Sequence, residues 1–178
     1  AKTQEKVLEL EEKFTKVVAN ERNWATLKSK IDEISNQIKS DYDISKIKIL
    51  EGETTSSAYI MTDSSDNQIS AFYAGAMSEN SSLSVKGLNS DLVVISPNDP
   101  KAMVKFAKEA KEAGMDYVMD PGMQLPALEA SDLKNMIDGA TILIGNDYEI
   151  SLLKEKTALS ETELLNQVKV LITTLGAN

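Results

Sequence analysis

The chain has no cysteine and no histidine among its 178 residues. These two absences exclude disulfide bonds, thiolate nucleophiles, imidazole bases and zinc sites of the usual kind. Any general base must therefore be an aspartate or a glutamate, and any metal ion must be held by oxygen ligands. Aromatic residues make up only 5% of the chain, so aliphatic side chains and methionine have to form most of the core.

Long apolar runs and a surplus of positive charge are also missing. No apolar run approaches the length that spans a bilayer, and no signal-peptide pattern opens the chain. The net charge of −9 disfavours binding to nucleic acids and to anionic membranes, but it does not exclude a nucleotide that brings its own magnesium. We therefore expect a cytoplasmic protein that binds neither nucleic acid nor membranes.

The chain does have four short apolar runs, each followed by a polar loop that contains glycine or proline. The runs occupy residues 92–95, 117–119, 141–144 and 170–172. The segments between them have helical periodicity, and strands that alternate with helices form a parallel sheet. The predicted fold class is α/β, with a short parallel sheet and flanking helices on both faces. Ligands of such sheets bind beyond the carboxyl ends of the strands, so a site should lie there.

The first 42 residues differ from the rest in charge and in pattern. Residues 1–42 carry eight basic and eight acidic side chains, whereas residues 43–178 carry eleven and twenty. Two apolar series at helical spacing predict two antiparallel helices: Val7, Leu10, Phe14 and Val17, then Trp24, Leu27, Ile31, Ile34 and Ile38. We expect this helical hairpin to pack on itself and to cover an apolar face of the rest. A surface for self-association or for a partner is the alternative.

Residues 43–84 have the pattern of a small β segment followed by a linker. Residues 46–49 alternate between lysine and isoleucine, which predicts a strand. Two more runs, 57–62 and 68–73, flank a polar turn. The two later runs predict a β-hairpin. A hairpin alone is barely stable, so this one has to pack on something or serve as a lid over a site. The Ser- and Asn-rich stretch 78–84 is typical of a linker to the α/β core of residues 85–178.

Capping signals place the helices of this core. Pro100 suits the first turn of a helix that Gly114 ends, and Ser131 opens a short helix. Asn146 can cap a further helix. Ser160 has a glutamate three residues later, which is the pattern of a capping box.

Asn146 and Glu149 are the most distinctive polar pair. They place an amide and a carboxylate one helical turn apart, at the end of a strand and the start of a helix. Glu149 can there organise the water shell of a magnesium ion. The alternative is an N-cap with a favourable first-turn acid, and the spacing alone favours it.

Two other strand ends also carry polar residues. The Pro-Gly turn after Asp120 leaves this carboxylate at the crevice, but such turns are common, and the motif alone favours a structural role. Gly176 lets a nucleotide approach the backbone and Thr174 offers a hydroxyl to phosphate or ribose, with an ordinary strand exit as an equal alternative. Parallel strands bring their carboxyl ends to one edge of the sheet. The residues expected at that edge are Asn98, Asp120, Asn146, Glu149 and Thr174.

Several stretches together resemble the ribokinase-like, or PfkB, family of carbohydrate and nucleoside kinases. The stretches are residues 55–62, 66–73, 95–100, 120–126, 146–149 and 173–176, in the family's order and approximate spacing. The resemblance covers roughly residues 43–178. It implies the family's fold and an ATP-dependent phosphoryl transfer to a hydroxyl of a sugar or a nucleoside.

The resemblance also implies roles for particular residues. Asn146 and Glu149 correspond to the family's magnesium and phosphate motif, with Glu149 at the metal. Thr174 and Gly176 correspond to the start of its nucleotide-binding loop, and ATP and magnesium are the implied cofactors. The hairpin corresponds to the lid over the phosphoryl acceptor. The residues expected in the acceptor crevice are Tyr73, Asn98 and Asp120.

Two features of the family have no counterpart in this sequence. Family members begin with a strand and a Gly-Gly motif that holds the acceptor, whereas residues 1–42 have a helical pattern. They also continue into a G-A-G-D motif that supplies an anion hole and the catalytic base, and this sequence reaches Asn178 without one. We therefore expect a partial kinase with unknown catalytic residues and no turnover by this chain alone.

Three interpretations of the chain follow from this comparison. In the first, it is a kinase whose missing parts come from another chain. In the second, it is a non-catalytic fragment or an engineered chimera, in which the helical hairpin covers sheet surface. In the third, it is a binding or assembly module that uses the two N-terminal helices. An assay of ATP consumption with sugars and nucleosides separates the first interpretation from the others.

Overall fold

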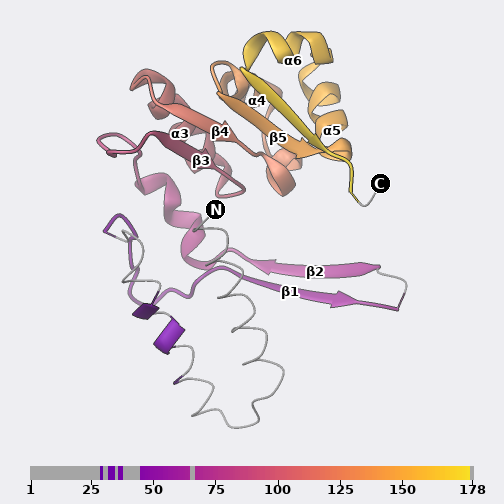
Figure 1. Cartoon of the computed structure of the whole chain (residues 1–178). Coiled ribbons are helices and arrows are strands. Elements are labelled where there is room, and N and C mark those ends of the chain that lie inside the picture. Colours follow the sequence, from indigo (N-terminus) through magenta and orange to yellow (C-terminus); the bar gives the residue numbers. More distant parts are fainter. Residues whose placement is uncertain (1–28, 30–31, 35, 38–44, 65–66, 177–178) are drawn as a thin grey trace. The chain divides into compact units, whose positions relative to one another are not determined.

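The computed structural model describes residues 29, 32–34, 36–37, 45–64 and 67–176 (Figure 1). The chain divides into two compact units, Ala1–Ile49 and Leu50–Asn178. In the first unit, residues 29, 32–34 and 36–37 are helical, as the second apolar series predicts. The packing of the two predicted N-terminal helices, with Trp24, falls outside the described residues and stays a prediction.

The predicted β-hairpin is present in the second unit. Strands β1 (Ser57–Thr62) and β2 (Gln68–Tyr73) pair antiparallel, with Ser57 opposite Tyr73 and Thr62 opposite Gln68 (Figure 1). At the turn, the Asp63 carboxylate accepts hydrogen bonds from the backbone and side-chain N–H groups of Asn67, at 3.0 and 2.9 Å. The polar turn residues thus fix the register of two strands whose side chains are almost all exposed.

The strand predicted at residues 46–49 is wrong, because the described residues 45–56 contain no strand. Ile47 and Ile49 are 66% and 86% exposed. An alternating pattern forms a strand only where a neighbouring strand supplies hydrogen bonds and packing. The sequence pattern alone does not contain that information.

The stretch predicted as a linker forms the 3₁₀ helix η1 (Gly75–Ser82). Gly75 has a φ of +49°, and a Cβ added to it would lie 2.2 Å from the carbonyl oxygen of Thr54. The next residue, Ala76, donates its backbone N–H to that same oxygen at 2.8 Å. Only glycine fits this close crossing, which ties the exit of the hairpin to its entry.

Four parallel strands form the sheet of the core, as the apolar runs predict. They are β3 (Leu92–Ile95), β4 (Asp116–Met119), β5 (Ile142–Asn146) and β6 (Val170–Thr174). Their order in the sheet is their order in the chain (Figure 1). All three pairings are parallel, so every carboxyl end reaches the same edge.

Helices connect these strands. They are α3 (Pro100–Glu112), η2 (Gly122–Ala127), α4 (Ala130–Ile137), α5 (Asp147–Thr157) and α6 (Glu161–Gln167). Helices α3, α5 and α6 begin at the predicted signals. The helix predicted to open at Ser131 begins at Ala130 instead, and its N-cap residue Glu129 makes no side-chain hydrogen bond. The carboxylate of Asp99 caps α3 by accepting the N–H of Ala102 at 2.9 Å. Within the described ranges, no helix is long and apolar enough to span a bilayer.

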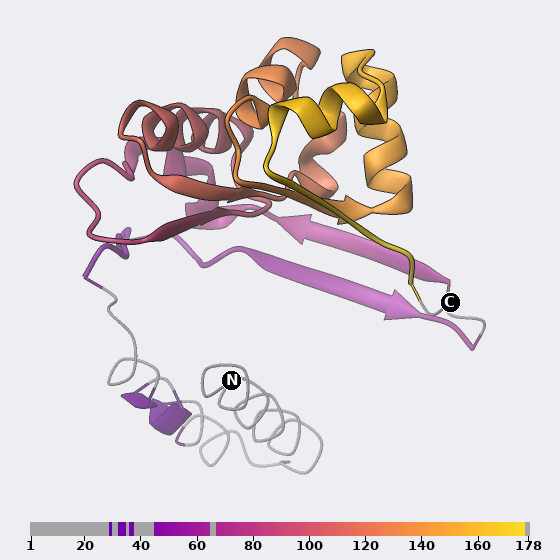
Figure 2. The same ribbon diagram turned by 45° about the horizontal axis from the view of Figure 1, so that its top comes forward.

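The core lies between these helices and one face of the sheet (Figure 2). Because strand side chains alternate, residues such as Tyr117, Met119 and Leu143 point to this face and are buried. The Tyr117 hydroxyl donates to the carbonyl of Met136 at 3.0 Å. Burial, with the nearby Asp138 charge, raises the pKa of Tyr117 to about 12.

The opposite face of the sheet is apolar as well. Leu92, Val94, Val170 and Ile172 lie on it and are exposed. The α/β prediction is confirmed, but the helices of the described region cover one face and not two (Figure 2). Helical periodicity shows that a helix has an apolar stripe, but not which face of the sheet that stripe meets.

Candidate functional site

The carboxyl edge of the sheet brings polar residues from separate loops together. Asn146 and Thr174 are direct neighbours in the β5–β6 register. Asp120 follows β4, and its backbone N–H donates to the carbonyl of Ile95 at the end of β3, at 2.9 Å. Asn98 comes three residues after that strand end. The parallel arrangement therefore places these residues at the edge where ligands of α/β sheets bind.

Asn146 and Glu149 form a complete capping box at the start of α5. The side-chain oxygen of Asn146 accepts the backbone N–H of Glu149 at 2.8 Å, and Oε2 of Glu149 accepts the backbone N–H of Asn146 at 2.8 Å. Among the described residues, the Asn146 amide nitrogen and Glu149 Oε1 have no hydrogen-bond partner. The box thus leaves two amide N–H groups and one carboxylate oxygen at the strand end for a ligand.

Gly145 makes room for this box. A Cβ at Gly145 would lie 3.3 Å from Glu149 Cβ, 3.4 Å from its Oε2 and 3.2 Å from Ile150 Cδ1. The 3.2 and 3.3 Å contacts are tighter than most Cβ contacts, so a side chain at this position would push Glu149 and Ile150 away. Gly145 was not among the residues expected at the site, although a glycine directly before an Asn-x-x-Glu pattern is a signal of this crowding.

Asp120 is half-buried beside Glu149. Burial is the main cause that raises the pKa of the Asp120 carboxyl, the negative charge of Glu149 raises it further, and a hydrogen bond from the Gly122 backbone opposes both. Gly122 has a φ of +44°, and a Cβ there would lie 2.5 Å from Pro97 Cγ. The Pro-Gly turn therefore packs closely on Pro97 in the loop after β3, and this packing keeps Asp120 on the side of Glu149.

Asn98 and Tyr73 are placed differently from the other candidates. The side-chain oxygen of Asn98 accepts the Asn80 amide and the backbone N–H of Asp99, each at 2.7 Å. Asn80 belongs to η1, so this bond joins the segment after the hairpin to the sheet edge. Tyr73 lies on β2 and is 56% exposed, and no hydrogen bond joins it to the edge in the described part of the chain. Sequence reasoning missed Asn80, which no motif marks.

The loop after β6 carries the last two candidates. Thr174 and Gly176 are both exposed. Gly176 has a φ of +69°, and a Cβ added to it would meet no atom within 4 Å, so its surroundings are open. The conformation favours glycine, and the open space lets a ligand approach the backbone. The ligand roles of Thr174 and Gly176, like those of the other candidates, stay predictions.

A magnesium ion would find few direct protein ligands at this edge. No group of three acidic residues that could hold a metal exists in the described part of the chain. Magnesium usually keeps several of its waters, and Glu149 Oε1 is free to accept from one of them. The residues present therefore fit a hydrated ion that Glu149 holds through water, with phosphate oxygens as its other ligands.

A four-stranded parallel sheet flanked by helices, with a preceding β-hairpin, matches the fold of ribokinase-like solved structures. The chain belongs to the pfkB family of carbohydrate kinases, whose sequence profile matches residues 31–178. This confirms the resemblance seen in the sequence.

Nucleoside kinases are among the most similar relatives. The nucleoside kinase of Methanocaldococcus jannaschii is 33% identical over 138 residues, which are 77% of this chain and 45% of that protein. The nucleoside kinase of Burkholderia thailandensis, solved in complex with inosine, is 30% identical with a TM-score of 0.77, over 81% of this chain and 48% of that one. The solved structure of the M. jannaschii enzyme has a TM-score of 0.74, over 80% and 48%. The chain thus spans about half the length of these relatives.

Proposed function

We propose that this chain carries part of the active site of an ATP-dependent nucleoside kinase, namely the phosphate side and the lid over the acceptor. The observation that supports this most directly is the capping box of α5, which leaves an amide and a carboxylate oxygen unpaired at the carboxyl edge of the sheet. Thr174 lies beside Asn146 on the neighbouring strand. Donors and a hydrated cation at a strand end suit the phosphates of a nucleotide.

Each residue of this edge has one proposed task. Asn146 donates its side-chain amide to a phosphate oxygen, and Glu149 accepts a hydrogen bond from magnesium-bound water through Oε1. Thr174 donates its hydroxyl to phosphate or ribose, and Gly176 lets the nucleotide approach the backbone. Magnesium, when bound with ATP, neutralises charge on the phosphates. Oε2 of Glu149 accepts the Asn146 backbone N–H at the same time, so both side chains are positioned before the ligand binds.

A nucleoside is the favoured acceptor over a free sugar. Relatives that are 33% and 30% identical to this chain are named nucleoside kinases, and one of 30% identity was solved with inosine. The hairpin exposes Tyr59 and Tyr73 on one of its faces. Aromatic rings stack well on the planar base of a nucleoside, which a sugar lacks. Asn98 and Asp120 would then face the acceptor's polar groups at the sheet edge.

The experiment that tests this function compares inosine with ribose as ligands of the purified chain. Amide NMR spectra are recorded with each ligand in the presence of magnesium and ADP. We expect inosine to shift the amide signals of the hairpin and of the loops after β3 and β4, and ribose to shift them much less at equal concentration. Stronger shifts with ribose would contradict the nucleoside assignment. No shifts with any of the ligands would contradict the proposal as a whole.

A further inference from the structure

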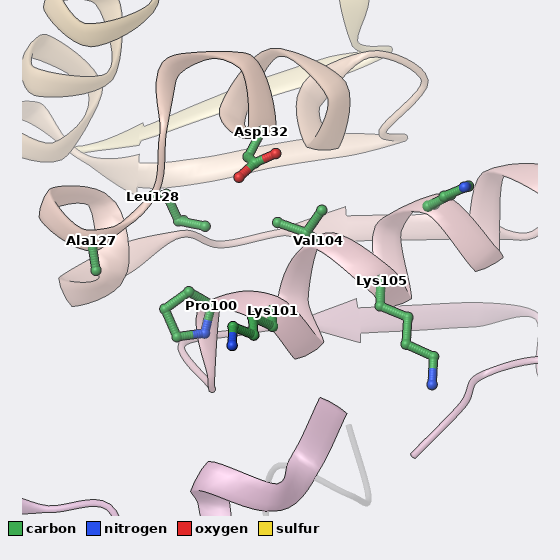
Figure 3. Close-up of a pocket in the computed structure, with 8 residues that line it drawn as sticks. Pro100, Lys101, Val104, Lys105, Ala127, Leu128 and Asp132 are labelled. Atoms are coloured by element: carbon green, nitrogen blue, oxygen red, sulfur yellow. The ribbon is translucent and has the colours of Figure 1, made fainter. Parts of the chain in front are cut away.

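A groove on the helical side of the core has no task in the proposed function. It lies between α3 and the segment from η2 to α4, and its volume is about 460 Å³ (Figure 3). A second cavity of about 570 Å³ adjoins it and shares Val104 and Lys108 with it. Together the two cavities follow α3 from Pro100 to Glu112, a helix of 13 residues. That corresponds to a length of roughly 20 Å.

The groove has an apolar floor and charged walls. Val104 of α3 points across it toward Asp132 of α4, and Leu128 and Ala127 close one end (Figure 3). Leu128 is only 2% exposed and so belongs to the floor. The α3 wall carries lysines, whereas Asp132 is the acid of the opposite wall. A ligand for this groove must therefore be apolar along its centre and negative toward α3.

Two of the α3 lysines are available for such a ligand. Lys105 is occupied, because its ammonium donates to the carbonyls of Ser81 and Leu83 at 3.0 and 2.6 Å. Lys101 has no hydrogen bond or ion pair within the described ranges. Lys108 has only an exposed ion pair with Glu112 at 3.9 Å, and such pairs contribute little. Lys101 and Lys108 are two helical turns apart on the same side of α3, about 10 Å along the axis.

The local charge is opposite to that of the whole chain. Helix α3 has four lysines and two glutamates, although the chain has a net charge of −9. One of the glutamates, Glu109, is buried, and its carboxylate accepts from the Ser84 hydroxyl and the Val85 N–H at 2.7 and 2.9 Å. These hydrogen bonds stabilise the carboxylate, and Lys105, whose Nζ lies 3.9 Å from Glu109 Oε1, offsets its charge. Lys111 forms an ion pair with Asp138, so the positive charge that α3 offers to a partner is that of Lys101 and Lys108, and it attracts acidic groups.

We propose that this groove binds an acidic amphipathic helix of a partner protein. Two acidic residues seven positions apart on that helix pair with Lys101 and Lys108, and an apolar residue between them packs on Val104 and Leu128. The flank of the partner helix that faces Asp132 carries a basic or neutral residue. The length of the groove suits a helix of three to four turns, which is a common mode of helix-in-groove recognition. Asp132 and Glu112 on the walls disfavour nucleic acid and polyphosphate ligands.

The test uses a fluorescently labelled synthetic helix and the whole 178-residue chain. The peptide has glutamates seven positions apart, leucine between them and one lysine on the other flank. Binding is measured by fluorescence anisotropy, and the contact surface is mapped by amide NMR. We expect the amide shifts to follow α3 and α4, and the affinity to fall as salt is added. No binding up to about 1 mM peptide at low salt would overturn the proposal, since that limit corresponds to a very weak complex.

A matched pair of double variants separates this groove from general electrostatics. Lys101→Gln with Lys108→Gln should weaken peptide binding about fivefold or more, which is the range that two exposed charge pairs supply. Lys134→Gln with Lys154→Gln makes the same change in net charge outside both cavities and should alter the affinity less than about twofold. A peptide with glutamine in place of both glutamates should bind equally to the wild type and to the first double variant. Equal losses in the two double variants would overturn the proposal.

Discussion

Two helices of this protein begin with the same capping motif, yet only one of the two motifs lies at the candidate site. Asn146 and Glu149 close the box of α5, and Ser160 and Glu163 close the box of α6. In both, the glutamate accepts the N-cap backbone N–H, at 2.8 and 2.7 Å. The local geometry is therefore equivalent, and a local motif cannot tell a functional helix start from a structural one.

The surroundings make the difference between the boxes. The α5 box follows a strand, with Thr174 beside it, Gly145 beneath it and Asp120 nearby. The α6 box follows another helix, and its serine hydroxyl also donates to Glu163 at 2.6 Å. The hydroxyl therefore satisfies itself within the box, whereas the Asn146 amide nitrogen has no partner among the described residues. The proposed ligand role of the α5 box therefore depends on the residues that the sheet brings next to it.

The largest expected difference between the boxes is in nucleotide affinity. Glu149→Gln should weaken the binding of magnesium-ADP about tenfold or more, because the variant loses the charge that orients the ion's water shell. Glu163→Gln makes the same chemical change in the other box and should leave the affinity unchanged. Isothermal titration calorimetry with the purified chain measures both. Equal affinities for the two variants would remove Glu149 from the nucleotide site.

The two boxes should be much more alike in stability. Asn146→Ala and Ser160→Ala each remove a side-chain N-cap, and each should lower the free energy of unfolding by about 1 kcal/mol. Urea unfolding followed by circular dichroism gives both values under the same conditions. If Asn146→Ala proved neutral while Ser160→Ala cost stability, the Asn146 cap would be strained in favour of ligand binding, and the structural equivalence of the boxes would fail.

Much of the core could be predicted from the sequence, because its signals are local. Runs of apolar residues with polar ends predicted all four strands of the sheet, and β3 has the predicted bounds. Residues 46–49 show where such signals fail, since an alternating pattern becomes a strand only beside a partner. The bare face of the sheet, with Val94 at 63% exposure, is another such case. Which face a helix covers depends on contacts between distant segments.

The same limit applies to the candidate site. The rule that parallel strands end at one edge was enough to place Asp120, Asn146 and Thr174 together. It did not predict that Asn98 is held by Asn80, because that bond joins residues 18 positions apart in two different elements. Nor did it predict the role of Gly145, whose importance is the space that it leaves for Glu149.

The smallest expected difference is in the pH dependence of stability, and it has opposite signs near the two boxes. The pKa of Asp120 is raised above its ordinary value of 3.8, chiefly by burial and then by Glu149. Between the ordinary pKa of Asp120 and its raised pKa, the folded state binds more protons than the unfolded state. The free energy of unfolding therefore falls as the pH rises through this window.

The pKa of Glu163 is lowered from 4.5, chiefly by the hydrogen bond from the Ser160 side chain and then by that from the Ser160 backbone. Its contribution is therefore complete above 4.5 and is lost as the pH falls through the lowered pKa.

Titration of the carboxyl groups by NMR, together with unfolding at several pH values, measures both effects. Glu149→Gln should lower the pKa of Asp120 but leave it above the ordinary value, because burial remains. Ser160→Ala should bring the pKa of Glu163 back toward its ordinary value and leave Asp120 unchanged. Asp120→Asn should abolish the loss of stability that follows a rise in pH through the Asp120 window. An unchanged pKa of Asp120 in Glu149→Gln would contradict this prediction. The two carboxylates would then be too far apart in solution to act on one ligand. The α5 box would lose the charged neighbour that distinguishes it from the α6 box.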